Sequence, residues 1–182
     1  MIKTYIALLR GINVGGNNII KMENLKQCFV NMKFSAVKTY IQSGNVVFKT
    51  EDTDTLKLIK IIENQLMETF SIGIKTTVLT AEELSETIKN APKDFGSEPE
   101  KFRYDVWFLL PDITADKIMS NIRLREGVDF LQAGKHAMYS SRLISEAGKS
   151  YLLKINQTSM YKNITVRNWN TTVKLFSYAS QE

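Results

Sequence analysis

Alternating and helical patterns of apolar residues divide the first third of the chain into clear elements. Residues 3–9, KTYIALL, are largely apolar on both alternating sets, which is typical of a strand buried on both faces. Leu25, Cys28, Phe29 and Met32 then follow the spacing of one helical stripe. The pattern therefore predicts a buried strand followed by an amphipathic helix.

The next segment predicts a hairpin, a helix and a strand. Two β-rich runs in residues 36–50 flank the turn sequence Ser43-Gly44-Asn45. Asp54 is placed to cap a long helix, and residues 74–79 read as the strand after it. The buried stripe of that helix is expected to comprise Ile59, Ile62, Leu66 and Phe70. The order β-α-β-β-α-β predicts an α+β fold with a ferredoxin-like half over residues 1–80.

A helix and a linker, residues 81–101, separate this half from the rest. Thr80 and Glu83 have the spacing of a capping box, and residues 92–101 hold two of the three prolines. Residues 102–182 then predict a strand, a helix, a hairpin near Gly134 and two helices after Lys149. We expect a second, related α+β half that ends in C-terminal helices.

The positive charge of the chain is concentrated near its C-terminus. The 182 residues carry a net charge of +5, but the segment from Lys135 to Lys174 holds seven Lys or Arg and one acid, Glu146. This segment is compatible with binding of an anionic partner and equally with an ordinary solvated basic surface. No signal peptide or membrane span is expected, so the sequence predicts a cytoplasmic protein without a membrane partner.

The stretch ALLRGINVGGNN, residues 7–18, is the first candidate site. A strand, a glycine loop and a helix in this order can aim backbone amides at an anion. Asn17 and Asn18 stand where a P-loop requires Lys and Ser or Thr, which excludes a P-loop nucleoside triphosphatase. A tight turn with positive φ at Gly15 or Gly16 explains the same residues, and both readings stay open. The candidate ligand-binding residues here are Arg10, Gly11, Asn13, Gly15, Gly16 and Asn17.

Two further groups of polar residues are candidates for ligand binding. Gln42, Ser43 and Asn45 lie at the predicted hairpin tip, where a tight turn would favour the same residue types. The segment 165–176 is expected to be helical, with an apolar stripe through Trp169. The guanidinium of Arg167 on its polar face can donate two parallel hydrogen bonds to a phosphate. From this segment we select Arg167, Asn168, Asn170 and Lys174.

The composition does not favour a metal site or a cofactor. One cysteine and one histidine cannot build a zinc site without carboxylates, and we expect neither a metal nor a cofactor. Cys28 lies on the apolar stripe and is expected to be an inert core residue. His136 is the only histidine that could act as a base, and no acid is placed behind it for a triad.

Three blocks of sequence resemble a bacterial family catalogued as domain of unknown function 1697. They are ALLRGINVGGNN at residues 7–18, TYIQSGNVVF at 39–48 and TVRNWNTTVKL at 165–175. The resemblance implies a small cytosolic protein of two α+β halves, the first ferredoxin-like, and it implies no reaction. It also raises the glycine loop from a turn to a candidate site.

Three functional hypotheses remain open. The first is binding of a phosphate-bearing partner, nucleic acid or nucleotide, through the glycine loop and the basic C-terminal region. The second is an enzyme acting on a small phosphorylated or carboxylated metabolite, and the third is a protein–protein interaction module, which includes a homodimer. We also expect the glycine loop and the hairpin tip to lie at opposite edges of the first sheet, taking its first and third strands as parallel.

Overall fold

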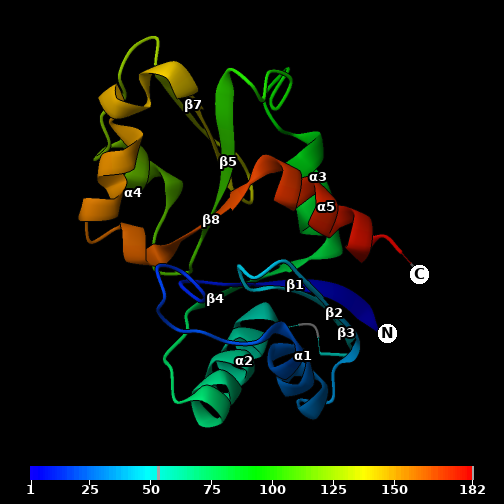
Figure 1. Cartoon of the computed structure of the whole chain (residues 1–182). Helices are drawn as coiled ribbons and strands as arrows, with labels where there is room; N and C mark the ends of the chain where they lie inside the picture. Colours follow the sequence, from blue (N-terminus) through cyan, green and yellow to red (C-terminus); the bar gives the residue numbers. More distant parts are fainter. Residues whose placement is uncertain (53, 182) are drawn as a thin grey trace. The chain divides into compact units, whose positions relative to one another are not determined.

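The computed structural model describes residues 1–52 and 54–181, and the chain divides into two compact units. Unit 1 comprises Met1–Leu84 with Lys174–Glu182, and unit 2 comprises Ser85–Val173. A four-stranded antiparallel sheet forms the centre of each unit (Figure 1). The fold is therefore α+β with two related halves, as predicted, while the exact boundaries expected from the sequence stay a prediction.

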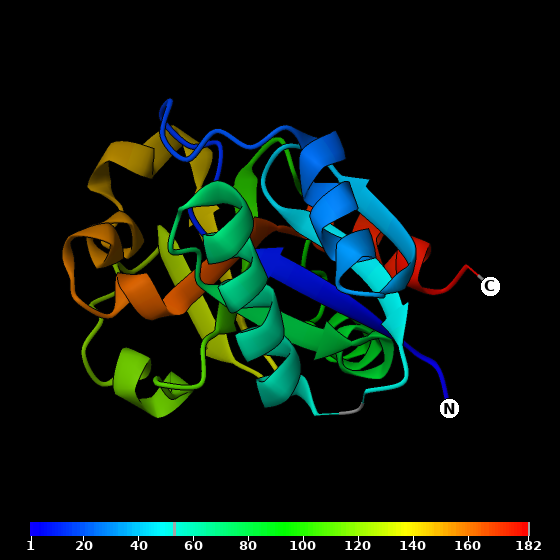
Figure 2. The ribbon, with the colours of Figure 1, turned by 90° about the horizontal axis from the view of Figure 1, so that it is seen from below.

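Unit 1 has the ferredoxin-like order of elements that the sequence predicts. Its elements are β1 (Lys3–Leu9), α1 (Met22–Asn31), β2 (Ser35–Tyr40), β3 (Asn45–Thr50), α2 (Thr55–Phe70) and β4 (Thr76–Thr80). The strands lie in the order β2-β3-β1-β4, and α1 and α2 lie side by side on one face of the sheet (Figures 1 and 2).

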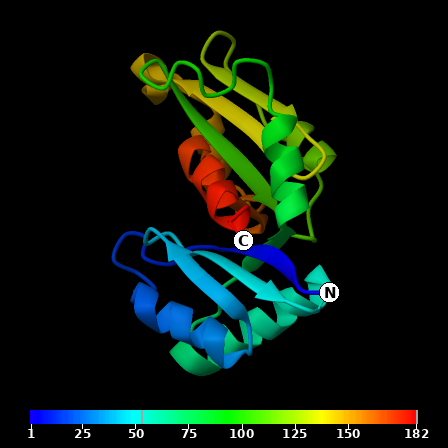
Figure 3. The ribbon, with the colours of Figure 1, turned by 90° about the vertical axis from the view of Figure 1, so that its right-hand side faces the viewer.

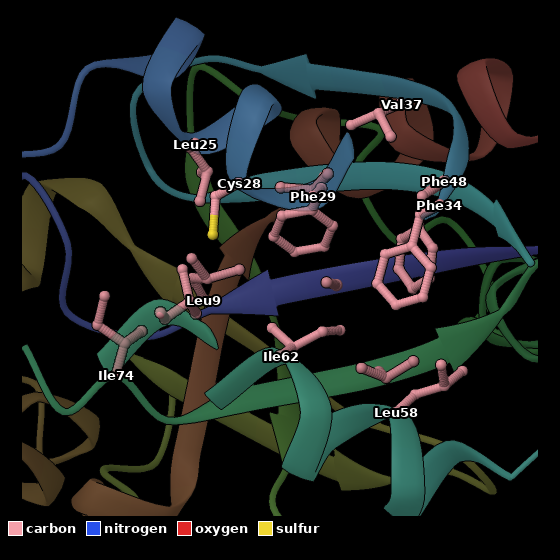
Figure 4. Packing of buried hydrophobic residues seen from close by; sticks show 14 of the residues in the cluster. Leu9, Leu25, Cys28, Phe29, Phe34, Val37, Phe48, Leu58, Ile62 and Ile74 are labelled. Carbon is pink, nitrogen blue, oxygen red and sulfur yellow. The ribbon is translucent and has the colours of Figure 1, made fainter. Parts of the chain in front are cut away.

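The core of unit 1 forms between this sheet face and the two helices. Phe29 of the α1 stripe meets Phe34 and Phe48 there, and the stripe of α2 packs into the same cluster (Figure 4). Every residue of β1 from Tyr5 to Leu9 is buried, so the expectation of a strand covered on both faces is confirmed. Asp54 accepts hydrogen bonds from the amides of Leu56 and Lys57 and caps α2 as predicted.

Helix α3 (Ala81–Lys89) begins with the predicted capping box. The amide of Thr80 donates to Glu83 at 2.8 Å, and the amide of Glu83 donates to the Thr80 hydroxyl at 3.1 Å. Two donors at the start of the helix are satisfied in this way.

Unit 2 repeats the strand order of unit 1. Its elements are β5 (Phe102–Leu109), α4 (Ala115–Met119), β6 (Asp129–Ala133), β7 (Met138–Leu143), the 3-10 turns η1 (Ile144–Lys149), η2 (Leu152–Gln157) and η3 (Tyr161–Asn163), and β8 (Ile164–Asn168). Helix α5 (Trp169–Ala179) begins in unit 2, and its residues from Lys174 onward belong to unit 1. The strands lie in the order β6-β7-β5-β8, which is the unit 1 order when the strands of each unit are counted along the chain (Figure 3). Side chains of α4 and η2 cover one face of this sheet, and Thr87 of α3 bonds Tyr139 on the other.

The C-terminal segment differs from the prediction of two helices. Two 3-10 turns, a strand and one helix follow Lys149. The helix expected from residue 165 is wrong in its first turn, because Ile164–Asn168 is strand β8, paired with β5. The β-branched residues of this run complete the sheet of unit 2, and that tertiary pairing outweighs the helical spacing.

Candidate functional site

The glycine loop and the hairpin tip of unit 1 lie side by side, which corrects the expectation that they occupy opposite edges. β1 and β3 are antiparallel, with Leu8 opposite Asn45, so the end of β1 meets the start of β3. The Asn13 side chain joins the two segments, because its Nδ2 donates to the carbonyl of Gln42 at 2.8 Å. The same side chain also exchanges hydrogen bonds with the backbone of Ile20.

The glycine loop is itself a small hairpin. The amide of Asn17 donates to the carbonyl of Val14, and Gly15 and Gly16 between them have φ of +58° and +77°. Two central residues with positive φ are what a type I′ turn requires, and Gly-Gly is a preferred sequence for it. The amides of Asn13 and Asn17 are bonded inside the loop, so an anion cradle there has fewer free donors than expected and stays a prediction.

The other predicted residues of unit 1 mostly stabilise these turns. Asn45 is fully buried, and its Nδ2 donates to the Tyr40 carbonyl and to the Ser43 hydroxyl. Arg10 is half-buried, with its amide bonded to the Lys75 carbonyl, while Gln42 is exposed. Gly11 is exposed as well, and its carbonyl accepts from the side chain of Asn18.

The third predicted group is divided between a strand and a helix. Arg167 lies on β8 and is buried, and this desolvation lowers the pKa of its guanidinium to about 10. Asn168 caps α5, since its Oδ1 accepts from the Asn170 amide and its Nδ2 donates to the Tyr104 carbonyl. Lys174 lies on α5 with its ammonium 5.0 Å from the Tyr178 ring. The expectation that Arg167 and Lys174 share one polar helix face is therefore wrong.

Unit 2 holds a cavity of about 350 Å³ where β8 gives way to α5. β7 pairs with β5 from Phe102 onward, but β8 reaches only as far as Asp105, so residues 102–104 have no strand on that side. This first cavity occupies the gap. Its lining includes Asn168 and Asn170, which the sequence indicated as candidate ligand-binding residues. The other lining residues are Gly96, Pro99, Phe102, Arg103, Tyr104, Arg142, Ile144, Ala147 and Trp169.

Two arginines give the first cavity its charge. Arg103 and Arg142 face each other directly across β5 and β7 and lie on one face of the sheet. Nε of Arg103 donates to Asp105 at 2.8 Å, whereas Nε of Arg142 is buried and bonds to no group in the described part of the chain. Like charges directly opposite each other destabilise a sheet. An anion between the two guanidinium groups would offset their mutual repulsion.

An aromatic wall and the start of α5 complete the first cavity. Trp169 packs against Gly96, where φ is +90° and a Cβ would overlap ring atoms Cδ1 and Nε1 of the indole. The ring of Phe95 meets the indole edge-on, 5.1 Å away. Asn170 in the first turn of α5 also lines the cavity, which places the positive end of an eleven-residue helix beside the two arginines.

No local pattern in the sequence indicates this arrangement. Arg103 and Arg142 lie far apart along the chain, and only the pairing of β5 with β7 brings them together. Trp169 was expected in the core and is half-buried in the cavity wall. A search for like-charged residues on adjacent predicted strands could have raised the pair as a candidate.

The described residues form neither a metal-binding cluster nor a helix that could span a membrane. Among residues 1–52 and 54–181, no group of three or more His, Cys, Asp or Glu is arranged to hold a metal ion. In the described part of the chain, no helix is both long and apolar enough to cross a membrane.

Comparison with known proteins places the chain in a family. The family described as protein of unknown function (DUF1697) matches residues 2–139. The chain belongs to this family. It is also similar to a solved structure, conserved bacterial protein SP0830 from Streptococcus pneumoniae, with 26% identity and a TM-score of 0.85 over 99% of this chain and 100% of that one. No curated protein matches the chain.

Proposed function

We propose that this DUF1697 protein binds a small phosphate-bearing molecule in the first cavity of unit 2. The observation that carries the proposal is the facing pair Arg103 and Arg142, of which Arg142 has a buried Nε without an acceptor among the described residues. A guanidinium fork matches the geometry of phosphate oxygens, and two forks on one sheet face can hold one phosphate between them.

The shape of the site favours a small molecule over a nucleic acid. Small-molecule sites are typically concave, about 300–1,000 Å³, with aromatic walls and a few placed polar groups. The first cavity has about 350 Å³. Its aromatic lining and its arginines meet that description, and the start of α5 adds a favourable field for an anion. A nucleic acid remains the alternative partner, and the cytoplasmic location and the homodimer also remain predictions.

The proposal is tested by titrating the full chain with inorganic phosphate and recording backbone amide shifts by NMR. We expect saturable shifts at Arg103, Arg142 and Asn170. Arg142→Ala should weaken phosphate binding by about tenfold or more, because a charge-assisted hydrogen bond is worth roughly 1.5–3 kcal/mol. Arg142→Lys should recover part of the loss, since it keeps the charge but not the fork.

Two variants serve as controls for this experiment. Lys162→Ala removes an exposed charge from the same basic segment and should leave the affinity unchanged. Gly15→Ala alters the glycine loop and should also leave it unchanged. Loss of phosphate binding in Gly15→Ala, with Arg142→Ala binding normally, would transfer the site to the glycine loop and refute the proposal.

A further inference from the structure

A second cavity adjoins the two arginines on the same sheet face. Its volume is about 240 Å³, and it shares Arg103 and Arg142 with the first cavity. The sheet contributes Asp105, Trp107, Ser140 and Val166, and the turns η2 and η3 cover it with Leu152, Leu153, Ile155, Asn156 and Tyr161. A ligand held by the arginines therefore has space on both sides of them.

Two buried polar atoms of this cavity's lining residues have no hydrogen-bond partner among the described residues. They are Oδ1 of Asp105 and Nε of Arg142. The other carboxylate oxygen of Asp105 accepts from Nε of Arg103 at 2.8 Å, so the carboxylate is held in place by that bond. Buried polar groups are nearly always hydrogen-bonded, and the exceptions often mark a place where a ligand or water bonds.

The two atoms require different partners. A carboxylate oxygen only accepts hydrogen bonds, and a guanidinium nitrogen only donates them. A phosphate satisfies Arg142 but would repel Asp105. A hydroxyl group can donate to Oδ1 of Asp105 without that repulsion, so the two atoms suit a ligand that carries both a phosphate and a hydroxyl group.

We infer that the ligand is a phosphorylated polyhydroxy compound, such as a sugar phosphate, that spans both cavities. Its phosphate lies in the first cavity against Arg103 and Arg142, and a hydroxyl group lies in the second against Asp105. The inference rests on the proposed function, because it takes the arginines as the phosphate site. Trp107 and Tyr161 give the second cavity apolar walls that suit the carbon skeleton of such a ligand.

The test compares three probes on the unaltered chain: inorganic phosphate, ribose 5-phosphate and ribose. We expect ribose 5-phosphate to bind at least tenfold more tightly than inorganic phosphate in calorimetric titrations, and ribose alone to bind much more weakly than either. The comparison needs no variant, so it does not depend on how a substituted chain folds.

A matched pair of variants locates the hydroxyl contact. Asp105→Asn should remove most of the tenfold gain of ribose 5-phosphate over inorganic phosphate. The readout is the ratio of the two affinities within the variant, because Asp105 also bonds Nε of Arg103. Asp112→Asn removes the same charge at an exposed position outside both cavities and should leave both affinities unchanged.

The outcomes separate the two proposals. If inorganic phosphate binds but ribose 5-phosphate binds no more tightly, the hydroxyl inference is overturned and the proposed function stands. Retention of the full gain in Asp105→Asn would also overturn it. If neither phosphate compound binds, the proposed function fails and this inference fails with it.

Discussion

At the scale of single residues, the close approach of Gly96 and Trp169 holds the wall of the first cavity in place. Gly96 has a φ of +90°, and a side chain there would overlap the indole ring. Both the backbone conformation and the space therefore require glycine. Trp169 in turn precedes Asn170, so its position fixes the first turn of α5 at the cavity.

Gly96→Ala should lower the free energy of unfolding by about 2–4 kcal/mol, because strain at positive φ and overpacking against Trp169 act together. Phosphate binding should weaken as well, since the indole must move. Urea unfolding followed by tryptophan fluorescence measures the first effect. Gly148→Ala is the control, since no atom lies within 4 Å of a Cβ there, and it should change stability by less than about 0.5 kcal/mol. Equal stability losses in the two variants would contradict this account.

Asn13 connects the glycine loop to the hairpin tip through three hydrogen bonds. Its Nδ2 donates to the carbonyls of Ile20 and Gln42, and its Oδ1 accepts from the buried amide of Ile20. The residue itself has a φ of +53°, which asparagine tolerates better than most residues. A residue predicted to bind a ligand is thus engaged in organising two loops.

Asn13→Ala should destabilise the chain by about 2–3 kcal/mol, because a buried amide loses its acceptor and alanine is disfavoured at this φ. Hydrogen exchange of the Ile20 amide should accelerate in the same variant. Asn17→Ala provides the comparison, since its side chain makes a single 3.5 Å bond to Gly15 and is exposed. If Ile20 exchanges no faster in Asn13→Ala, the side chain does not hold the two loops together.

At the scale of elements, the sequence predicts local structure well where periodicity and caps agree. The Asp54 cap, the Thr80–Glu83 capping box and both hairpins all depend on neighbouring residues, and the structure confirms them. Strand β8 was missed because five residues are too few to show an alternating pattern against the helix that follows at once. The Asn168 cap was the available signal that a helix begins at Trp169 rather than at 165.

The candidate site was less predictable than the fold. The reason is the same for the glycine loop of unit 1 and for the first cavity of unit 2. Asn13 meets Gln42, and Arg103 meets Arg142, only through the pairing of strands distant in sequence. Residue types could therefore suggest polar candidates such as Asn168 and Asn170, but not which of them line a cavity. The assumed parallel pairing of β1 and β3 had the same origin, since strand direction follows from the whole topology.

The β6–β7 hairpin and α3 are joined by an ionic cluster that should respond to acid. Glu86 accepts from Nζ of Lys135 and is paired with Nε2 of His136, each at 2.7 Å. The hydrogen bond from Lys135, followed by that from His136, lowers the pKa of Glu86 below its usual value. The unfolded chain therefore takes up a proton at Glu86 at a higher pH than the folded chain does.

The stabilisation from this cluster should be complete above the usual glutamate pKa and should disappear as the pH falls through the lowered one. In Glu86→Gln, the melting temperature should consequently decline less steeply than in the original chain between about pH 5 and pH 3. Circular dichroism melts across this range measure the difference. Glu126→Gln, an exposed position, should follow the original curve. Parallel curves for all three chains would show that the Glu86 cluster contributes nothing to acid stability.

At the scale of the whole molecule, the basic C-terminal segment offers less free charge than its sequence suggests. Lys135 is paired with Glu86, and Lys149 is paired with Glu146 at 2.5 Å. Arg167 is buried, and Arg142 lines the first cavity. Nucleic-acid binding depends on many exposed cations that displace counterions together, whereas a single phosphate needs only two well-placed guanidinium groups.

A small-molecule site and a nucleic-acid surface can be distinguished by competition and salt. An oligonucleotide of about 20 residues without a terminal phosphate should bind weakly, with a salt slope shallower than about −2, because few phosphates are contacted at once. It should not displace inorganic phosphate from the first cavity, since a chain of phosphodiesters is too bulky to enter it. NMR titration with the oligonucleotide, before and after saturation with phosphate, measures both. A steep salt slope together with displacement of phosphate would favour the nucleic-acid hypothesis, because one anionic chain would then cover the arginines and the basic segment together.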